Sequence, residues 1–330
     1  MQKGTPTDAQ VAILLATYNG ERYLDELMRS LLAQTHCDFV VIARDDCSND
    51  QTPTILSRWS TAYPDKVFLL SDKRGRLGSL RSFSLLMEEC ASPYFALCDQ
   101  DDVWLPEKVA LCFREMRALE ETCGKAMPIL VHSDLTVVDQ NLREISASFF
   151  KRIRVNPTRA GQLDQLIINN MVAGCSSMGN QALLELACPI PDEVPYHDWW
   201  LALLAASCGV LRTMAQPTLL YRQHGGNQIG AQIQVRLDVL RKLRLAIRSP
   251  RVLTAKITRG MLRSQSQASV LLSIAGDNML SRHREFLQIF CLLHRRHETA
   301  HLPWGQRAWL FIRFLAIRTR ALPLVMRFCF

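Results

Sequence analysis

The 330-residue sequence predicts an α/β fold in which helices flank a mostly parallel sheet, followed by a helical C-terminal extension. Two observations carry this prediction. Apolar segments of strand length alternate with segments of helical periodicity through the first part of the chain, which is typical of parallel sheets with helices on both faces. Polar and acidic side chains follow several of the apolar segments, where open sheets of this kind bind their ligands.

Each expected element follows from its local pattern. Residues 11–16 form a continuous apolar run, as a parallel strand covered on both faces does. A helix is expected over residues 21–34, where apolar side chains recur on one face, and a second strand over residues 38–43. The later expected elements are strands at residues 67–70, 94–98 and 129–132, a helix at residues 106–121, and a buried apolar helix from Trp199 to Leu211.

The segment Asp99-Gln100-Asp101-Asp102 places three carboxylates directly after the expected strand at residues 94–98. Like charges packed this closely are unfavourable unless a cation neutralises them, and Mg²⁺ and Mn²⁺ prefer carboxylate oxygens. The alternative is that Asp102 only caps the next helix, which has Pro106 in its first turn. Because that alternative explains one carboxylate of three, the segment predicts a divalent-metal site for a diphosphate-bearing substrate.

Three further positions have both a functional and a structural interpretation. Arg81 is either an additional cation for phosphates or a surface residue of a helix. Asp198 is either a helix cap or a general base, with Trp199 and Trp200 as a wall for a sugar ring. His224 is either a metal or phosphate ligand or a solvated loop residue. The chain contains neither a G-x-G-x-x-G turn nor a phosphate-binding P-loop motif.

Cysteine usage and charge indicate the cellular compartment of the protein and the kind of partner that it meets. The 11 cysteines include no C-x-x-C pair and the chain opens without a signal segment, so we expect a reduced, cytoplasmic protein without an integral membrane span. Residues 229–330 carry 18 Lys and Arg against 4 Asp and Glu, a net charge of +14, whereas residues 1–228 have a net charge of −6. The basic part is expected to meet an anionic partner.

Four motifs, taken in order, resemble the family-2 nucleotide-sugar glycosyltransferases, which have the GT-A fold and act by inversion. They are Ala16-Thr17-Tyr18-Asn19, Asp45-Asp46-Cys47-Ser48-Asn49-Asp50, Asp99-Gln100-Asp101-Asp102 and His197-Asp198-Trp199-Trp200. Together with Tyr221-Arg222-Gln223-His224 they are most similar to bacterial rhamnosyltransferases. The resemblance covers residues 10–228 and implies a glycosyltransferase domain over residues 1–228.

The resemblance implies a nucleotide-binding end of the site. Tyr18, beside Thr17, would stack on the nucleotide base, and Asp46, together with Asp45, would hydrogen-bond it. Cys47 departs from the glycine that is commoner at this position of the family.

The resemblance also implies a metal and a base. Asp101 would be the principal protein ligand of Mg²⁺ or Mn²⁺, and Asp99 would contact the ribose or the metal. Asp198 would deprotonate the acceptor hydroxyl. Arg81 and His224 complete the expected nucleotide-sugar site.

The implied reaction is an inverting, metal-dependent transfer of a sugar from a nucleoside-diphosphate sugar, with L-rhamnose from dTDP-rhamnose favoured. The acceptor would be a hydroxyl of a lipid-linked or polysaccharide molecule in bacterial cell-surface glycan synthesis, such as O-antigen synthesis. The alternatives are transfer of a glucosyl, galactosyl or N-acetylhexosaminyl group by the same fold, or a non-catalytic protein that binds carbohydrate or nucleic acid. Hydrolysis is disfavoured, since its two carboxylates would flank a glycosidic bond rather than gather in one segment.

Residues 229–330 form the expected helical extension. Residues 233–245 are expected to pack on the catalytic body. Residues 304–330 interleave arginines with tryptophans and phenylalanines, which favours a peripheral position on the inner face of the bacterial cytoplasmic membrane. Nucleic-acid binding is the rival interpretation of this segment, but no nucleic-acid partner is expected because the body is acidic and no nucleic-acid module is recognisable.

Overall fold

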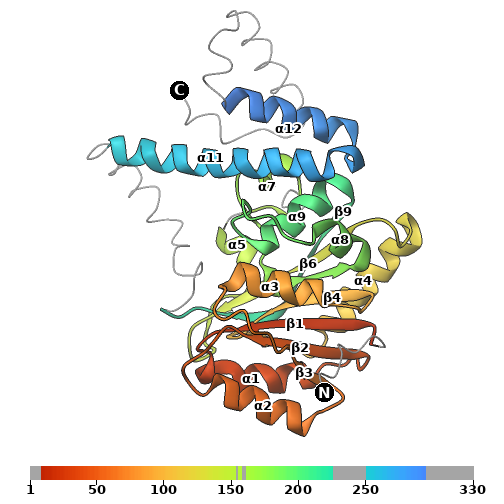
Figure 1. Ribbon diagram of the computed structural model, residues 1–330, viewed down its shortest axis with the longest axis vertical. Helices are drawn as coiled ribbons and strands as arrows, with labels where there is room; N and C mark the ends of the chain where they lie inside the picture. Colours follow the sequence, from red (N-terminus) through yellow and green to blue (C-terminus); the bar gives the residue numbers. More distant parts are fainter. Residues whose placement is uncertain (1–8, 154, 158–160, 226–249, 295–330) are drawn as a thin grey trace, which may run out of the picture.

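The body of the protein is a sheet with helices on both faces, and two long helices cover one end of it (Figure 1). The computed structural model describes residues 9–153, 155–157, 161–225 and 250–294. The first strands of the chain and the two long helices lie at opposite ends of the longest axis.

The first four strands build a parallel part of the sheet. They are β1 (Val11–Thr17), β2 (Phe39–Asp45), β3 (Val67–Leu69) and β4 (Tyr94–Asp99), and they alternate with α1 (Glu21–Leu32), α2 (Thr52–Ala62) and α3 (Ser79–Glu88). β1 pairs in parallel with β2 and β4, and β2 pairs in parallel with β3. Residues 11–15 are fully buried and contribute to apolar clusters on both faces, as their unbroken apolar run predicts.

The second half of the body turns the sheet into a mixed one. Its elements are β5 (Val103–Trp104), α4 (Lys108–Cys123), β6 (Ile129–Val138), β7 (Glu144–Ser146), α5 (Phe149–Ile153), α7 (Leu163–Leu166), η1 (Gly174–Ser176), β8 (Ser177–Asn180), α8 (Gln181–Ala187), α9 (His197–Cys208) and β9 (Val210–Arg222). β8 lies antiparallel between β4 and β6, and β6 pairs in parallel with β9. Within the described residues the strand order is β3-β2-β1-β4-β8-β6-β9-β5, with β7 beside β6.

The apolar run from Trp199 to Leu211, expected as one helix, forms two elements. α9 ends at Cys208 and β9 begins at Val210. A Cβ at Gly209 would collide with the carbonyl oxygen of Pro128, and Val210 N donates to that same oxygen at 2.9 Å. Pairing with β6 therefore ends the helix, and this tertiary contact leaves no trace in the periodicity of the segment.

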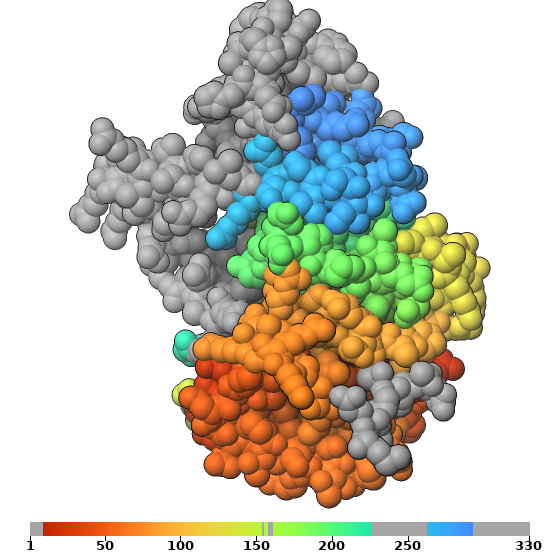
Figure 2. Space-filling model, viewed as in Figure 1, coloured from red at the N-terminus to blue at the C-terminus, as the bar shows by residue number. Residues whose placement is uncertain are grey.

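Two helices confirm the expected helical C-terminal extension. α11 (Pro250–Ala275) and α12 (Ser281–His294) are joined by η3 (Gly276–Asn278). Leu271 and Leu287 are fully buried in the apolar cluster that contains Trp200 of α9. Figure 2 shows these helices in blue against the green segment that contains α9.

Several expectations concern residues outside the described ranges. The division at residues 228 and 229 falls there, as do the segments 233–245 and 304–330. Among the described helices, none combines the length and apolar character needed to cross a membrane.

Candidate active site

A pocket of about 460 Å³ lies at the carboxyl ends of β1 and β4, where the topology of the sheet predicts ligand binding. The first turn of α9 and the segment before α3 complete its walls. Six of the residues that the sequence predicts for the site line this pocket: Thr17, Tyr18, Asp46, Asp99, Asp101 and Asp198. Asp45, Arg81 and His224 lie outside its lining.

Tyr18 forms an aromatic corner of the pocket. Gln100 holds its backbone, because Gln100 Oε1 accepts from Tyr18 N at 2.7 Å and Gln100 Nε2 donates to Tyr18 O at 2.9 Å. The guanidinium carbon of Arg76 lies 4.1 Å from the centre of the Tyr18 ring. Among the described pocket-lining residues, Arg76 is the sole Lys or Arg. This corner therefore combines a ring face with a positive charge.

Asp46 fixes the wall that precedes α3. Its Oδ1 accepts from Arg44 Nη1 and Leu77 N, and its Oδ2 accepts from Gly78 N, each at 2.7 Å. Burial raises the pKa of Asp46, but these hydrogen bonds outweigh burial and hold the pKa below its usual range. Arg44 also pairs with Asp72 at 2.7 Å, so a buried charge network anchors the wall.

Asp45 stabilises the turn after β2. Its carboxylate accepts from Thr17 Oγ1 at 2.9 Å, from Ser48 N at 2.8 Å and from Ser48 Oγ at 2.6 Å. Cys47 lies in this turn with φ of 61°, in the left-handed region that favours glycine. The turn thus keeps a glycine-like conformation although a cysteine occupies it.

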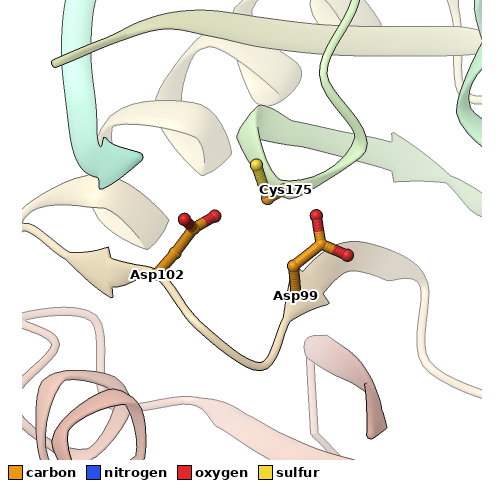
Figure 3. A group of neighbouring side chains, drawn as sticks. All are labelled: Asp99, Asp102 and Cys175. Atoms are coloured by element: carbon orange, nitrogen blue, oxygen red, sulfur yellow. The ribbon is translucent and has the colours of Figure 1, made fainter. Parts of the chain in front are cut away.

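Asp99, Asp102 and Cys175 point toward one another (Figure 3), and one oxygen or sulfur atom of each lies within 4.8 Å of the others. Burial raises the pKa of Asp102 and of Cys175 well above their usual ranges, and neighbouring carboxylates raise both further. Asp102 and Cys175 do not line the pocket. Because a hard cation needs deprotonated oxygen ligands, this buried, thiol-containing side of Asp99 suits Mg²⁺ or Mn²⁺ poorly.

Arg222, the last residue of β9, holds the segment between β4 and β5. Its Nε donates to Asp101 O at 2.7 Å and its Nη1 to Gln140 O at 2.8 Å, while its backbone N donates to Asp102 Oδ1 at 3.0 Å. The alternative that Asp102 caps the next helix is wrong, because α4 begins at Lys108 and Asp102 bonds to β9 instead.

His224 contacts the site through the side chain of Asp101. Its Nε2 lies 2.8 Å from Asp101 Oδ2. Burial, together with the negative charges of Asp101 and Asp198, raises the pKa of Asp99 to about 7. A bound divalent cation would relieve this repulsion. Asp99 and Asp101 both line the pocket, and carboxylate oxygens are ligands that suit Mg²⁺ or Mn²⁺.

Asp198 is buried at the start of α9, where Tyr196 rather than Asp198 is the N-cap residue. Its carboxylate accepts from Trp199 N at 2.6 Å, from Asn170 Nδ2 at 3.0 Å and from Gly174 N at 3.2 Å. Burial raises the pKa of Asp198 to about 6, with the hydrogen bonds acting in the opposite direction. A carboxyl group with a pKa this close to neutrality suits general-base chemistry.

Trp199 and Trp200 do not form the expected wall for a sugar. Their exposed fractions are 7% and 0%, and their indole nitrogens donate to Leu166 O and Ala187 O. They are core residues whose polar atoms are satisfied by backbone carbonyls. The aromatic ring that lines the pocket at this point belongs to Tyr196.

Arg81 ties α3 to the segment that precedes α9. Its Nη1 donates to Ile190 O at 2.8 Å, and its guanidinium also pairs with Asp192. Contact between Arg81 and a phosphate stays a prediction.

Sequence reasoning missed four residues with evident places in the site: Arg76, Gln100, Tyr196 and Arg222. Gln100 and Arg222 lie inside recognised motifs, so their positions could have suggested them. Arg76 is one of several cations in Lys73-Arg74-Gly75-Arg76, and nothing in that run distinguishes it from its neighbours.

Comparisons with known proteins identify the family of the chain. The family model described as glycosyl transferase family 2 matches residues 12–186, more than half of the chain. The chain therefore belongs to glycosyl transferase family 2 and is a glycosyltransferase.

Similar sequences include dTDP-rhamnosyl transferase RfbG of Shigella flexneri, which is 26% identical over 230 residues that cover 66% of this chain and 74% of the relative. An uncharacterised protein of Mycobacterium tuberculosis is 23% identical over 328 residues, 89% of this chain and 85% of the relative. Among solved structures, S. aureus TarS 1–349 in complex with UDP-GlcNAc matches with a TM-score of 0.54 at 18% identity, over 95% of this chain and 82% of that chain. This structural likeness confirms the GT-A fold.

Proposed function

We propose that this glycosyltransferase moves a sugar from a nucleoside-diphosphate sugar to a hydroxyl group, with inversion at the anomeric carbon and with Mg²⁺ or Mn²⁺. The observation that carries the proposal is the placement of Asp198 in the same pocket as Asp99 and Asp101. Direct displacement requires charge stabilisation at the leaving diphosphate and a base for the incoming hydroxyl, and these carboxylates provide a group for each.

The nucleotide is proposed to bind at the Tyr18 corner. The ring of Tyr18 offers a face for the base, and Arg76 beside it offers a charge for the diphosphate. Asp46 Oδ2 receives one hydrogen bond, from Gly78 N, and so keeps acceptor capacity for a base N–H. Thr17 and Asp45 support this corner through their mutual hydrogen bond.

Asp99, Asp101 and His224 are the residues that would hold the divalent cation. When bound, the cation would neutralise negative charge that develops on the departing diphosphate. The pairing of His224 with Asp101, and the anchoring of Asp101 O by Arg222, supply these groups with fixed positions.

Asp198 is the proposed base. Its carboxylate takes the proton of the acceptor hydroxyl while the acceptor oxygen bonds to the anomeric carbon, and the bond from that carbon to the diphosphate oxygen breaks. The hydrogen bonds from Asn170, Gly174 and Trp199 fix the orientation of the carboxylate before reaction.

The proposed donor is dTDP-rhamnose, which the similarity to a dTDP-rhamnosyl transferase of Shigella flexneri supports. The proposed acceptor is a lipid-linked or polysaccharide hydroxyl in bacterial cell-surface glycan synthesis, including O-antigen synthesis. The +14 charge of residues 229–330 supports a peripheral position on the inner face of the cytoplasmic membrane. A glucosyl, galactosyl or N-acetylhexosaminyl donor is the alternative.

A donor screen tests the proposal. Purified protein is incubated with dTDP-, UDP- and GDP-sugars, with and without Mg²⁺ or Mn²⁺, and both binding and slow hydrolysis of each donor are measured. We expect metal-dependent binding and hydrolysis, strongest with dTDP-rhamnose. Preference for another sugar would replace rhamnose as the proposed donor sugar. Metal-independent hydrolysis would contradict the proposed role of Asp99 and Asp101 as metal ligands.

A further inference from the structure

Tyr196 is the most exposed aromatic side chain that lines the pocket, with an exposed fraction of 36%. It lies directly before α9 and two residues before Asp198. The centre of its ring is 6.5 Å from that of Trp199, with 25° between the two planes. A buried indole therefore supports the tyrosine ring.

Two further uncharged rings line the pocket on this side. The rings of Phe83 and His197 stack at 4.0 Å with 24° between their planes, and both residues line the pocket. Burial lowers the pKa of His197 to about 3, so its imidazole is neutral near pH 7. Such a wall suits the C–H face of a neutral ring better than it suits an ionised group.

The segment that carries Tyr196 is anchored to α3. Arg81 donates to Ile190 O at 2.8 Å and pairs with Asp192. Pro195, which also lines the pocket, restricts the backbone directly before Tyr196. These contacts restrict the backbone of the segment that carries Tyr196, which limits the entropy lost on binding.

We propose that Tyr196 is the platform for the pyranose ring of a saccharide acceptor, the ring whose hydroxyl group Asp198 deprotonates. This inference rests on the proposed function, since it takes Asp198 as the base. In an inverting displacement the acceptor approaches opposite the leaving diphosphate, hence from the side of Asp198 rather than from that of Asp101. A ring bound through its hydroxyl to Asp198 then meets the wall formed by Tyr196, Phe83 and His197.

The chemistry of Tyr196 distinguishes a pyranose acceptor from two other ligands, a ring-free polyol and the sugar of the donor. A ring-free polyol or polyol phosphate presents no flat C–H face, so an aromatic platform would add little to its affinity. The donor sugar would meet Tyr196 only if the donor reached past Asp198. In that case replacement of Tyr196 would weaken donor binding as well.

The test uses the full chain with saturating Mg²⁺ and dTDP, and measures binding of methyl glycosides by saturation-transfer NMR. The probes are the methyl pyranosides of rhamnose, glucose, galactose and N-acetylglucosamine, with glycerol and ribitol as ring-free probes. The variants are Y196A, Y196F and Y63A. Tyr63 is a matched control, because it is 43% exposed and stacks on Trp59 but does not line the pocket.

We expect at least one pyranoside to bind the wild type through its ring protons, and Y196A to weaken that binding about three- to tenfold. Y196F and Y63A should retain it, because the first keeps the ring face and the second is remote. The affinity for dTDP, measured separately by calorimetry, should be the same in all four proteins.

Three outcomes would overturn the inference: unchanged pyranoside binding by Y196A, an equal loss of dTDP affinity in Y196A, or a wild type that binds none of the pyranosides. Failure of the proposed function would give a different experimental result. In that case the wild type binds no nucleoside diphosphate with Mg²⁺, whether dTDP, UDP or GDP, while pyranoside contact with Tyr196 is still measurable without nucleotide.

Discussion

His224 Nε2 lies 2.8 Å from Asp101 Oδ2, although 123 residues separate the two in the chain. The contact joins the segment after β9 to the segment after β4. Because Arg222, two residues earlier, also binds the backbone of Asp101, the end of β9 controls where this carboxylate points. If Asp101 holds the divalent cation as proposed, the end of β9 would orient this ligand and would belong to the site.

Replacement of Asp101 by alanine should abolish metal-dependent transfer, by at least about 100-fold, and leave the fold intact. The reason is that Asp101 is partly exposed on the pocket side, so its loss removes a ligand without opening the core. Transfer rates and thermal unfolding measure the two effects. Asp65→Ala removes an exposed carboxylate far from the pocket lining and serves as the control. Undiminished, metal-requiring turnover by folded D101A would exclude Asp101 as the ligand.

Replacement of Asp198 by asparagine should keep donor and metal binding but reduce transfer by about 10²- to 10⁴-fold, because an amide does not accept the proton of the hydroxyl. Asparagine must also present an N–H₂ group to one of the donors that bind Asp198, so we expect a loss of about 1 kcal/mol in stability. Calorimetric binding and initial rates separate the two roles. Equal losses in donor affinity and rate would mean that Asp198 only supports the fold.

The pH profile of transfer should follow the ionisation of Asp198. Since burial raises its pKa to about 6 and only the carboxylate is a base, the rate at saturating donor and metal should rise through about pH 6 and level off above it. Below that pH the rate should fall about tenfold per unit. Initial rates between pH 5 and pH 8 provide the measurement, and a rate that is highest at pH 5 would contradict the assignment.

Arg222→Lys should impair both stability and metal binding. The buried guanidinium bonds in separate directions to Asp101 O, Gln140 O and Glu26, and a lysine ammonium lacks this planar fork. We expect a loss of about 2–3 kcal/mol in the free energy of unfolding, and weaker Mn²⁺ binding in the fraction that remains folded. Arg58→Lys is the control, because the pair between Arg58 and Asp25 is largely exposed. Metal affinity equal to that of the wild type would mean that Arg222 acts on stability alone.

The C-terminal segment 304–330 should bind anionic membranes. Each arginine near an anionic surface contributes about 1 kcal/mol, and the interleaved aromatic side chains bury in the interface, so high salt should weaken binding without abolishing it. Co-sedimentation with anionic and neutral vesicles, comparing the full chain with one that ends at Leu302, measures this. If the full chain does not bind anionic vesicles but binds nucleic acid in a salt-sensitive way, the segment is a nucleic-acid-binding one instead.

Local patterns determined much of the architecture. Continuous apolar runs predict β1, β2 and β4, because a strand buried on both faces requires apolar side chains at every position. The same patterns place Tyr18, Asp46 and Asp99 at strand ends, and the carboxyl ends of parallel strands meet at one edge of a sheet. The family followed from the order of these motifs and was confirmed by the match over residues 12–186.

Tertiary structure alone decided how these groups are used. The sequence Trp199-Trp200 looks like an exposed aromatic wall, but both rings are core and the exposed ring is Tyr196. The antiparallel insertion of β8 between β4 and β6 brings Cys175 toward Asp99, and β9 brings Arg222 and His224 to Asp101. Such contacts depend on how distant segments pack, and the energies that select them are summed over the whole core rather than encoded in any local pattern.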